Sequence, residues 1–178
     1  FFKYHEYRTT RIRVPDYVSE YGAYTNSQNI KDARTLVLPY RPEDSYVEST
    51  NWGYWSLATV HSLLNKNNHV SFNLSNSDIE NNLLLNLYAL IDAGQTKWVG
   101  EAKRLGINYL LVRDDVLGTD IKKAPKLIDT KNIKRTLNTS ADVSLVKSFG
   151  PWHLYKMREV SPHITFATGY HVIRDYSD

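Results

Sequence analysis

The chain has 178 residues, of which 42% are hydrophobic and 23% are charged, and both values are ordinary for a globular domain. Its 22 basic and 19 acidic residues are interleaved and give a net charge of only +3, so the composition argues against a nucleic-acid-binding protein. Cysteine is absent, which excludes disulfides, thiolate metal sites and a cysteine nucleophile. We expect one soluble domain spanning residues 1–178.

The first residues combine aromatic and basic side chains in the sequence FFKYHEYRTTRIR. No window approaches the roughly 18 apolar residues that a membrane span needs. A start at Phe-Phe without Met suggests a domain excised from a larger membrane protein, and this composition is typical of the place where a span meets water. An edge strand of a soluble domain is an equally weighted interpretation.

In the first part of the chain the patterns predict a helix, a buried strand and a long surface loop. Pro15 suits a first helical position, and aromatic and apolar residues follow at spacings of three and four: Tyr17, Val18, Tyr21 and Tyr24. The apolar run at 34–40 predicts a buried strand. Residues 41–55 lack periodicity and are expected to form the loop. The spacing over 55–64 predicts a helix that buries Trp55 in the core and leaves Trp52 and Tyr54 more exposed.

In the second part, two helices precede the strongest predicted strand. Residues 73–94 carry a capping Asn76 or Ser77 and a stop at Gly94, and residues 95–106 end at Gly106. The run at 107–116 predicts the strand. Weaker patterns follow: a helix or loop at 130–140, a hairpin at 141–160 around Phe149-Gly150-Pro151, and a last strand within 163–176.

These elements predict an α/β fold with a small mixed sheet, parallel core strands, flanking helices and a C-terminal antiparallel hairpin. Residues 36–38 and 110–112 are apolar on both faces, so we expect them side by side in one parallel sheet. In the hairpin, residues 145–147 are expected to pair with 154–156. Trp152 and Tyr155 then face opposite sides unless a bulge intervenes.

No phosphate loop, dinucleotide-binding glycine motif, zinc-protease motif or nucleophile elbow occurs in the sequence. The six histidines are scattered, so we expect no metal site and no cofactor. Asp114 and Asp115 follow a predicted strand at its C-terminal end, where open α/β sheets bind ligands. They either contact a hydroxyl-rich ligand or act as a base there, or they cap the next turn.

The stretch STNWGYW, residues 49–55, places aromatic rings beside polar groups. Sugars present apolar faces and hydroxyls, which this mixture of side chains matches, although packing in the core explains the aromatic residues equally simply. The sequence assigns no catalytic residue. The candidate ligand-binding residues are Glu48, Asn51, Trp52, Tyr54, Arg113, Asp114 and Asp115.

Five pieces in order, VPDYVSEYGAY, RTLVLPY, NWGYW, AKRLGINYLLVRDDV and KSFGPWHLYKMRE, resemble the extracytoplasmic C-terminal domain of polytopic GT-C glycosyltransferases of the arabinofuranosyltransferase type. That resemblance implies a polyprenyl-phosphate sugar donor and a catalytic carboxylate on a loop between membrane helices, which this chain lacks. It therefore implies an accessory domain on the extracytoplasmic face. Its partners would be the transmembrane portion of the same chain and an acceptor glycan or protein.

Two further interpretations of the sequence stand beside the accessory domain. One is a free-standing α/β enzyme that uses Asp114 or Asp115 near His153. The other is a purely structural module, in which changes to the Trp52 loop alter stability and nothing else.

Overall fold

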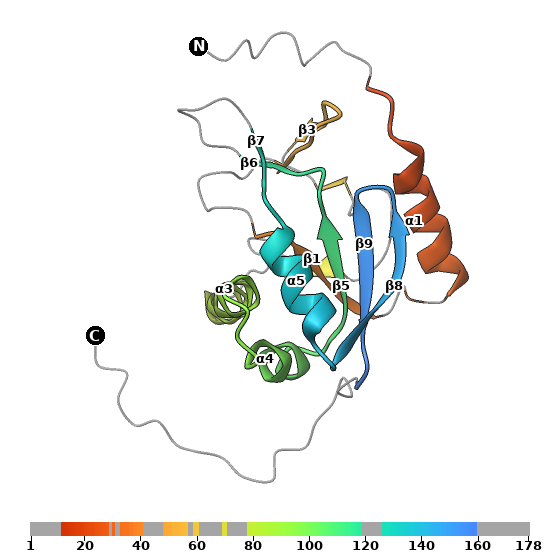
Figure 1. Ribbon diagram of the computed structural model, residues 1–178. Coiled ribbons are helices and arrows are strands. Elements are labelled where there is room, and N and C mark those ends of the chain that lie inside the picture. The colour runs from red at the N-terminus through yellow and green to blue at the C-terminus, as the bar shows by residue number, and fades with distance from the viewer. Residues whose placement is uncertain are drawn as a thin grey trace.

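A computed structural model describes residues 12–28, 30, 33–40, 48–56, 59–60, 69–70, 78–118 and 126–159 (Figure 1). The elements are α1 (Asp16–Ser27), β1 (Arg34–Leu38), β2 (Glu48–Ser49), β3 (Trp55–Ser56), β4 (His69–Val70), α3 (Asp78–Asp92), α4 (Trp98–Arg104), β5 (Ile107–Arg113), β6 (Leu117–Gly118), β7 (Lys126–Leu127), α5 (Lys131–Thr139), β8 (Val143–Phe149) and β9 (Trp152–Met157). Within the described residues, no helix is both long enough and apolar enough to cross a membrane.

A mixed five-stranded sheet in the order β4-β1-β5-β9-β8 forms the centre of the fold. β1 runs parallel to β4 and β5, whereas β5 and β9, and β9 and β8, are antiparallel. Residues 36–38 pair with 110–112, which confirms the predicted parallel core. The α/β class and the mixed sheet predicted from the sequence are likewise confirmed.

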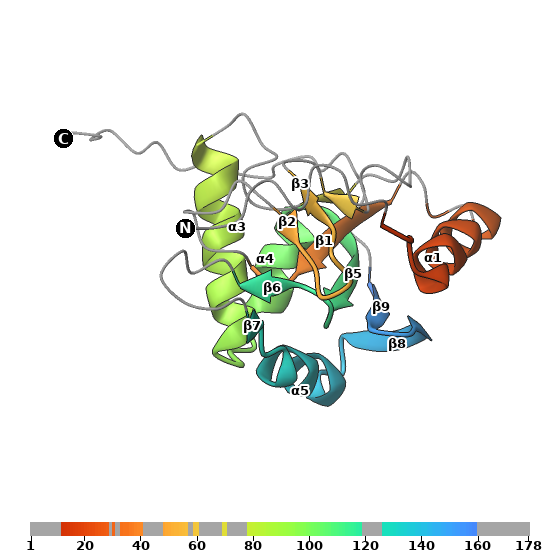
Figure 2. The ribbon, with the colours of Figure 1, turned by 90° about the horizontal axis from the view of Figure 1, so that it is seen from above.

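Helices cover both faces of the sheet, so the central strands β1 and β5 are buried on both sides. α3, α4 and α5 pack on one face around Leu110 and Val112. α1 packs on the other face, where its Tyr21 and Val18 meet Leu111. Figure 2 shows α1 on the side of the sheet opposite α3 and α4. This two-sided burial explains why β1 and β5 are almost continuously apolar.

Leu111 lies at the middle of β5 and has no exposed surface. Truncating it leaves a cavity against α1, so Leu111→Ala is expected to reduce the free energy of unfolding by about 3 kcal/mol. Leu145 on the edge strand β8 is 50% exposed and provides the matched control, with an expected cost below about 1 kcal/mol for Leu145→Ala. Urea denaturation measures both, and equal costs would contradict this account of the core.

The predicted C-terminal hairpin is confirmed, and Gly150 at its turn has a φ of +53°. Leu145 pairs with Tyr155 and Lys147 with Leu154, so Val146 is an extra residue on β8. The one-to-one pairing of β9 with β5 is unbroken. Trp152 therefore packs on the α1 face and Tyr155 on the opposite face, as a strand without a bulge requires.

The predicted helices begin and end close to the expected residues. α1 starts at Asp16, one residue after Pro15, whose backbone is extended. Gly94 and Gly106 follow α3 and α4 with φ of +68° and +65°, the left-handed conformation expected after a helix. The helix-or-loop segment at 130–140 forms the helix α5, which buries Ile133 and Leu137.

The prediction that Trp55 begins a helix and packs in the core is wrong, and so is the prediction that Trp52 and Tyr54 are more exposed than Trp55, because both are half-buried. Trp55 and Ser56 form strand β3, which pairs with Ser49 and Glu48, and the Trp55 side chain is 44% exposed. Gly53, with a φ of +91°, lets the chain reverse between the two strands. The second half of the expected surface loop is therefore a short hairpin. Residues 41–47, most of 57–64, the last predicted strand and residues 1–11 lie outside the described residues.

Candidate functional site

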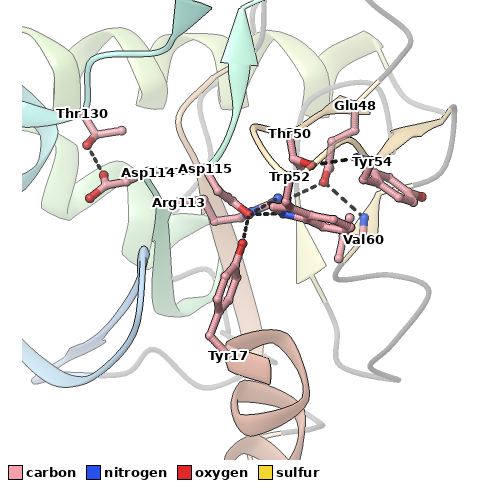
Figure 3. A network of polar contacts seen from close by, with 10 residues as sticks. All are labelled: Tyr17, Glu48, Thr50, Trp52, Tyr54, Val60, Arg113, Asp114, Asp115 and Thr130. Atoms are coloured by element: carbon pink, nitrogen blue, oxygen red, sulfur yellow. Dashed lines mark hydrogen bonds and ion pairs between the residues drawn. The ribbon is translucent and has the colours of Figure 1, made fainter. Parts of the chain in front are cut away.

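Arg113, the last residue of β5, holds together a buried group of charges (Figure 3). Its Nη1 donates to Oε1 of Glu48 at 2.7 Å, and its Nε donates to Oδ1 of Asp115 at 3.1 Å. Nη2 donates to Oδ2 of Asp115 at 3.3 Å. All three side chains are at most 2% exposed. The guanidinium therefore binds one carboxylate from β2 and another from the turn after β5.

Three aromatic side chains surround this group. The Tyr17 hydroxyl from α1 donates to Oδ2 of Asp115 at 2.9 Å, and the indole Nε1 of Trp52 donates to the same oxygen at 3.1 Å. Arg113 Cζ lies 4.6 Å from the centre of the Trp152 ring, within the range of a cation–π contact. Asp115 thereby joins α1, the β2–β3 hairpin and the end of β5.

The surroundings determine how these groups titrate. Burial by itself raises the pKa of Asp115, but the Arg113 charge and the hydrogen bonds to the carboxylate outweigh it, so the net pKa is lowered. For Arg113, burial lowers the pKa, but Glu48 and Asp115 outweigh it and raise the pKa overall. Burial and the Asp115 charge raise the pKa of Tyr17. Asp115 is thus held ionised, which does not suit a general base that must exchange protons near neutral pH.

The hairpin turn that carries Trp52 and Tyr54 is fixed by backbone contacts. Thr50 N donates to Tyr54 O at 3.0 Å, and Tyr54 N donates to Thr50 Oγ1 at 3.2 Å. Asn51 N donates to the backbone oxygen of Asp115 at 3.0 Å. The rings of Trp52 and Tyr54 lie 5.5 Å apart and are tilted by 32°. Both are half-buried against the α1-side core, whereas Asn51 is exposed.

Asp114 points away from Arg113 and belongs to a second polar group (Figure 3). It accepts hydrogen bonds from the Thr130 hydroxyl and from Lys134 Nζ, the latter at 2.6 Å. His153 Nε2 lies 3.1 Å from Asp114 Oδ2, and Nδ1 of the same ring lies 2.8 Å from Ser148 Oγ. Burial raises the pKa of Asp114, but the bonds from Lys134, Thr130 and His153 outweigh it, so the net pKa is lowered.

The structure therefore divides the seven candidate residues among three places. Glu48, Arg113 and Asp115 are buried and paired with one another; Asn51, Trp52 and Tyr54 form the turn above them; and Asp114 is in the second group. The sequence reasoning missed Tyr17, which is 98 positions from Asp115, and Trp152 beneath Arg113. Among the described residues no three potential metal ligands come together.

Known proteins resemble this chain in fold but not detectably in sequence family. No family model and no curated protein matches the sequence. A solved structure of the arabinofuranosyltransferase AftD from Mycobacteria superposes on 82% of this chain with a TM-score of 0.66 and 16% sequence identity. Two classes of a mutant of AftD match with TM-scores of 0.62 and 0.63, at 16% and 17% identity, over 83% and 81% of this chain.

This chain has the fold of one segment of AftD. The match covers only 12% of the AftD chain, or 13% in the mutant structures, so this chain spans about an eighth of the length of that protein. The resemblance to an arabinofuranosyltransferase-type membrane protein, inferred from five short sequence pieces, is confirmed at the level of the fold.

Proposed function

We propose that this chain is an accessory extracytoplasmic domain of a membrane glycosyltransferase. The observation that carries the proposal is the match to AftD, in which most of this chain corresponds to a small part of a much longer arabinofuranosyltransferase. The catalytic groups then lie elsewhere in the parent protein, and the partner of this domain is the transmembrane portion of the same chain. The lowered pKa values of Asp114 and Asp115 disfavour both carboxylates as a general acid or base near neutral pH.

Trp52, Tyr54 and Asn51 are the residues that we propose contact an acceptor glycan. The two half-exposed rings offer apolar planes for a sugar face, and Asn51 offers an amide to its hydroxyls. The bond from Trp52 Nε1 to Asp115 fixes the indole before a ligand arrives. Pre-ordering of this kind reduces the entropy lost on binding. The buried group of Arg113, Asp115 and Glu48 thus supports the turn and does not touch the glycan.

The experiment combines a transfer assay with a titration of the chain of 178 residues. A polyprenyl-phosphate arabinose donor and arabinofuranose oligosaccharides are supplied, with glucose oligosaccharides for comparison. We expect no sugar transfer. We expect a dissociation constant roughly in the high micromolar to millimolar range, which is what a shallow site with few contacts allows. Trp52→Ala should weaken binding, whereas Trp55→Ala on the outer side of the hairpin should leave it unchanged.

Other outcomes would favour the other two interpretations. Sugar transfer or hydrolysis that disappears in Asp114→Asn would contradict the accessory role and favour an enzyme built on Asp114, His153 and Ser148, which are linked by hydrogen bonds. If no oligosaccharide binds, and changes in the turn alter only stability, the chain is a structural module.

A further inference from the structure

Four of the seven large hydrophobic side chains that are exposed in the described residues belong to three segments at one end of the sheet. Ile12 and Val14 are each 39% exposed, Trp55 is 44% exposed and Leu127 is 52% exposed. They precede α1, lie on β3 and lie on β7, at the upper end of the molecule in Figure 1. Figure 2 is viewed onto this end, which we call the apolar end.

Contacts between the three segments hold the apolar end together. The Ile12 side chain lies against Gly53 at the hairpin turn, its Cγ2 3.6 Å from the position that a Cβ would take. Thr50 forms an isolated bridge with Val116, directly before β6, and Leu117 of β6 pairs with Leu127 of β7. The apolar end is therefore one connected part of the fold.

Basic groups accompany the apolar side chains. Arg13 lies between Ile12 and Val14 with 87% of its side chain exposed, and its Nη2 is 3.7 Å from Oδ1 of Asp16, whose side chain is 80% exposed. Lys126, next to Leu127, is also exposed. A tryptophan with aliphatic and basic side chains is the composition of surfaces that lie in lipid headgroups.

We propose that the apolar end rests on the membrane surface, with Trp55 and Leu127 entering the headgroup region of an anionic bilayer. The inference rests on the proposed function, because it requires a membrane beside the domain. It adds an orientation of the domain. The apolar end faces the bilayer, and α4 and the open end of the β8–β9 hairpin lie at the opposite end of the domain, away from the membrane (Figure 1). Trp52 and Tyr54, on the inner side of the hairpin, stay turned toward the α1-side core.

The occupant is a bilayer and not a glycan, because Ile12, Val14 and Leu127 carry no hydrogen-bonding group for sugar hydroxyls. A second copy of the chain is the competing occupant. A symmetric interface between two copies would bring the Lys126 charges of both chains to the same face, whereas anionic headgroups attract Lys126 and Arg13.

Flotation with phosphatidylcholine–phosphatidylglycerol vesicles tests the proposal on the 178-residue chain. Wild type should float with anionic vesicles and less so with phosphatidylcholine alone. The double variant Trp55→Ser, Leu127→Ser should lower the bound fraction at least about fivefold. Leu145→Ser, Val146→Ser on β8 removes comparably exposed side chains away from the apolar end and should change nothing. Unchanged thermal melting of both variants excludes unfolding as the cause.

Wild type that does not float, or a double variant that floats as well as wild type, would overturn the proposal. So would a concentration-dependent dimer of the wild type that the double variant abolishes. The oligosaccharide titration of the double variant separates this proposal from the proposed function. Glycan binding that persists without vesicle binding leaves the accessory role standing and removes only the orientation.

Discussion

Replacing Arg113 with methionine is expected to reduce the free energy of unfolding by about 3 to 5 kcal/mol at pH 7. The guanidinium is the buried cation that the structure places between Glu48 and Asp115, and it is 1% exposed. Methionine fills a similar volume but leaves two carboxylates inside the protein without their positive partner. The penalty comes mainly from these uncompensated charges and much less from lost packing.

The pH dependence distinguishes this cause from simple loss of packing. In wild type the pKa of Asp115 is lowered on folding, so its contribution is present above the unfolded pKa of about 4 and is lost as pH falls through the folded pKa. In Arg113→Met the buried Asp115 carboxyl loses the charge that lowers its pKa, so that pKa is expected to rise. The deficit relative to wild type should therefore shrink between pH 7 and pH 5.

Arg104→Met provides the matched control, because Arg104 pairs with Glu101 at 3.0 Å on the surface with 78% of its side chain exposed. Its expected cost is below about 0.5 kcal/mol. Urea denaturation at several pH values measures both variants. A cost for Arg113→Met below about 1 kcal/mol, or a deficit that does not change with pH, would contradict the buried-charge account.

Trp152→Ala is expected to cost about 3 to 5 kcal/mol. The indole has no exposed surface, stacks beneath Arg113, and makes edge contacts with Tyr17 and Tyr21 at 5.6 and 5.3 Å between ring centres. Its removal opens a cavity between α1 and the sheet and withdraws a face that the guanidinium contacts. The cavity and the lost contact with the guanidinium both destabilise the packing of α1 and Arg113 against the sheet.

Trp55→Ala is the comparison within the same chain, with an expected cost below about 0.5 kcal/mol because the ring lies on the outer face of β3. Guanidinium denaturation followed by circular dichroism gives both values without relying on tryptophan emission. Equal costs would mean that Trp55 belongs to the core after all, as the sequence pattern had predicted.

The local sequence pattern was sufficient to predict those elements whose burial depends on a few neighbouring residues. The runs at 36–38 and 110–112 are apolar on both faces, and only a sheet covered on both sides accommodates them. Phe149-Gly150-Pro151 between alternating runs located the hairpin. In the same way, Gly94 and Gly106 marked the helix ends.

Trp55 was misassigned because its spacing to the apolar residues that follow it in the sequence fits a helix. Gly53 before it permits a reversal, and two short strands joined by a turn carry too few residues to show alternation clearly. Spacing alone could not choose between a helix start and a hairpin. The antiparallel partner, Ser49, was decisive, and it lies in the stretch assigned to a loop.

The candidate site was predictable only as a list of residue types. Arg113 ends a strand, where a charged residue usually reaches solvent, and it is buried because Glu48, 65 positions away, arrives from β2. Asp114 and Asp115 are neighbours in sequence, but the turn directs them into separate groups with different partners. These outcomes depend on long-range packing, which a single sequence does not record.

The most direct test of the proposed accessory role is a titration of the nitrogen-15-labelled chain with arabinofuranose oligosaccharides, followed through the four tryptophan indole N–H signals. Trp52 should shift with added oligosaccharide, because its half-exposed ring carries the proposed contact and its N–H reports on Asp115. Trp98 and Trp152, at most 1% exposed, should not move, and Trp55 on the outer face should stay in place as well. A titration that leaves Trp52 unchanged at millimolar oligosaccharide, or that shifts all four signals together, would contradict the account.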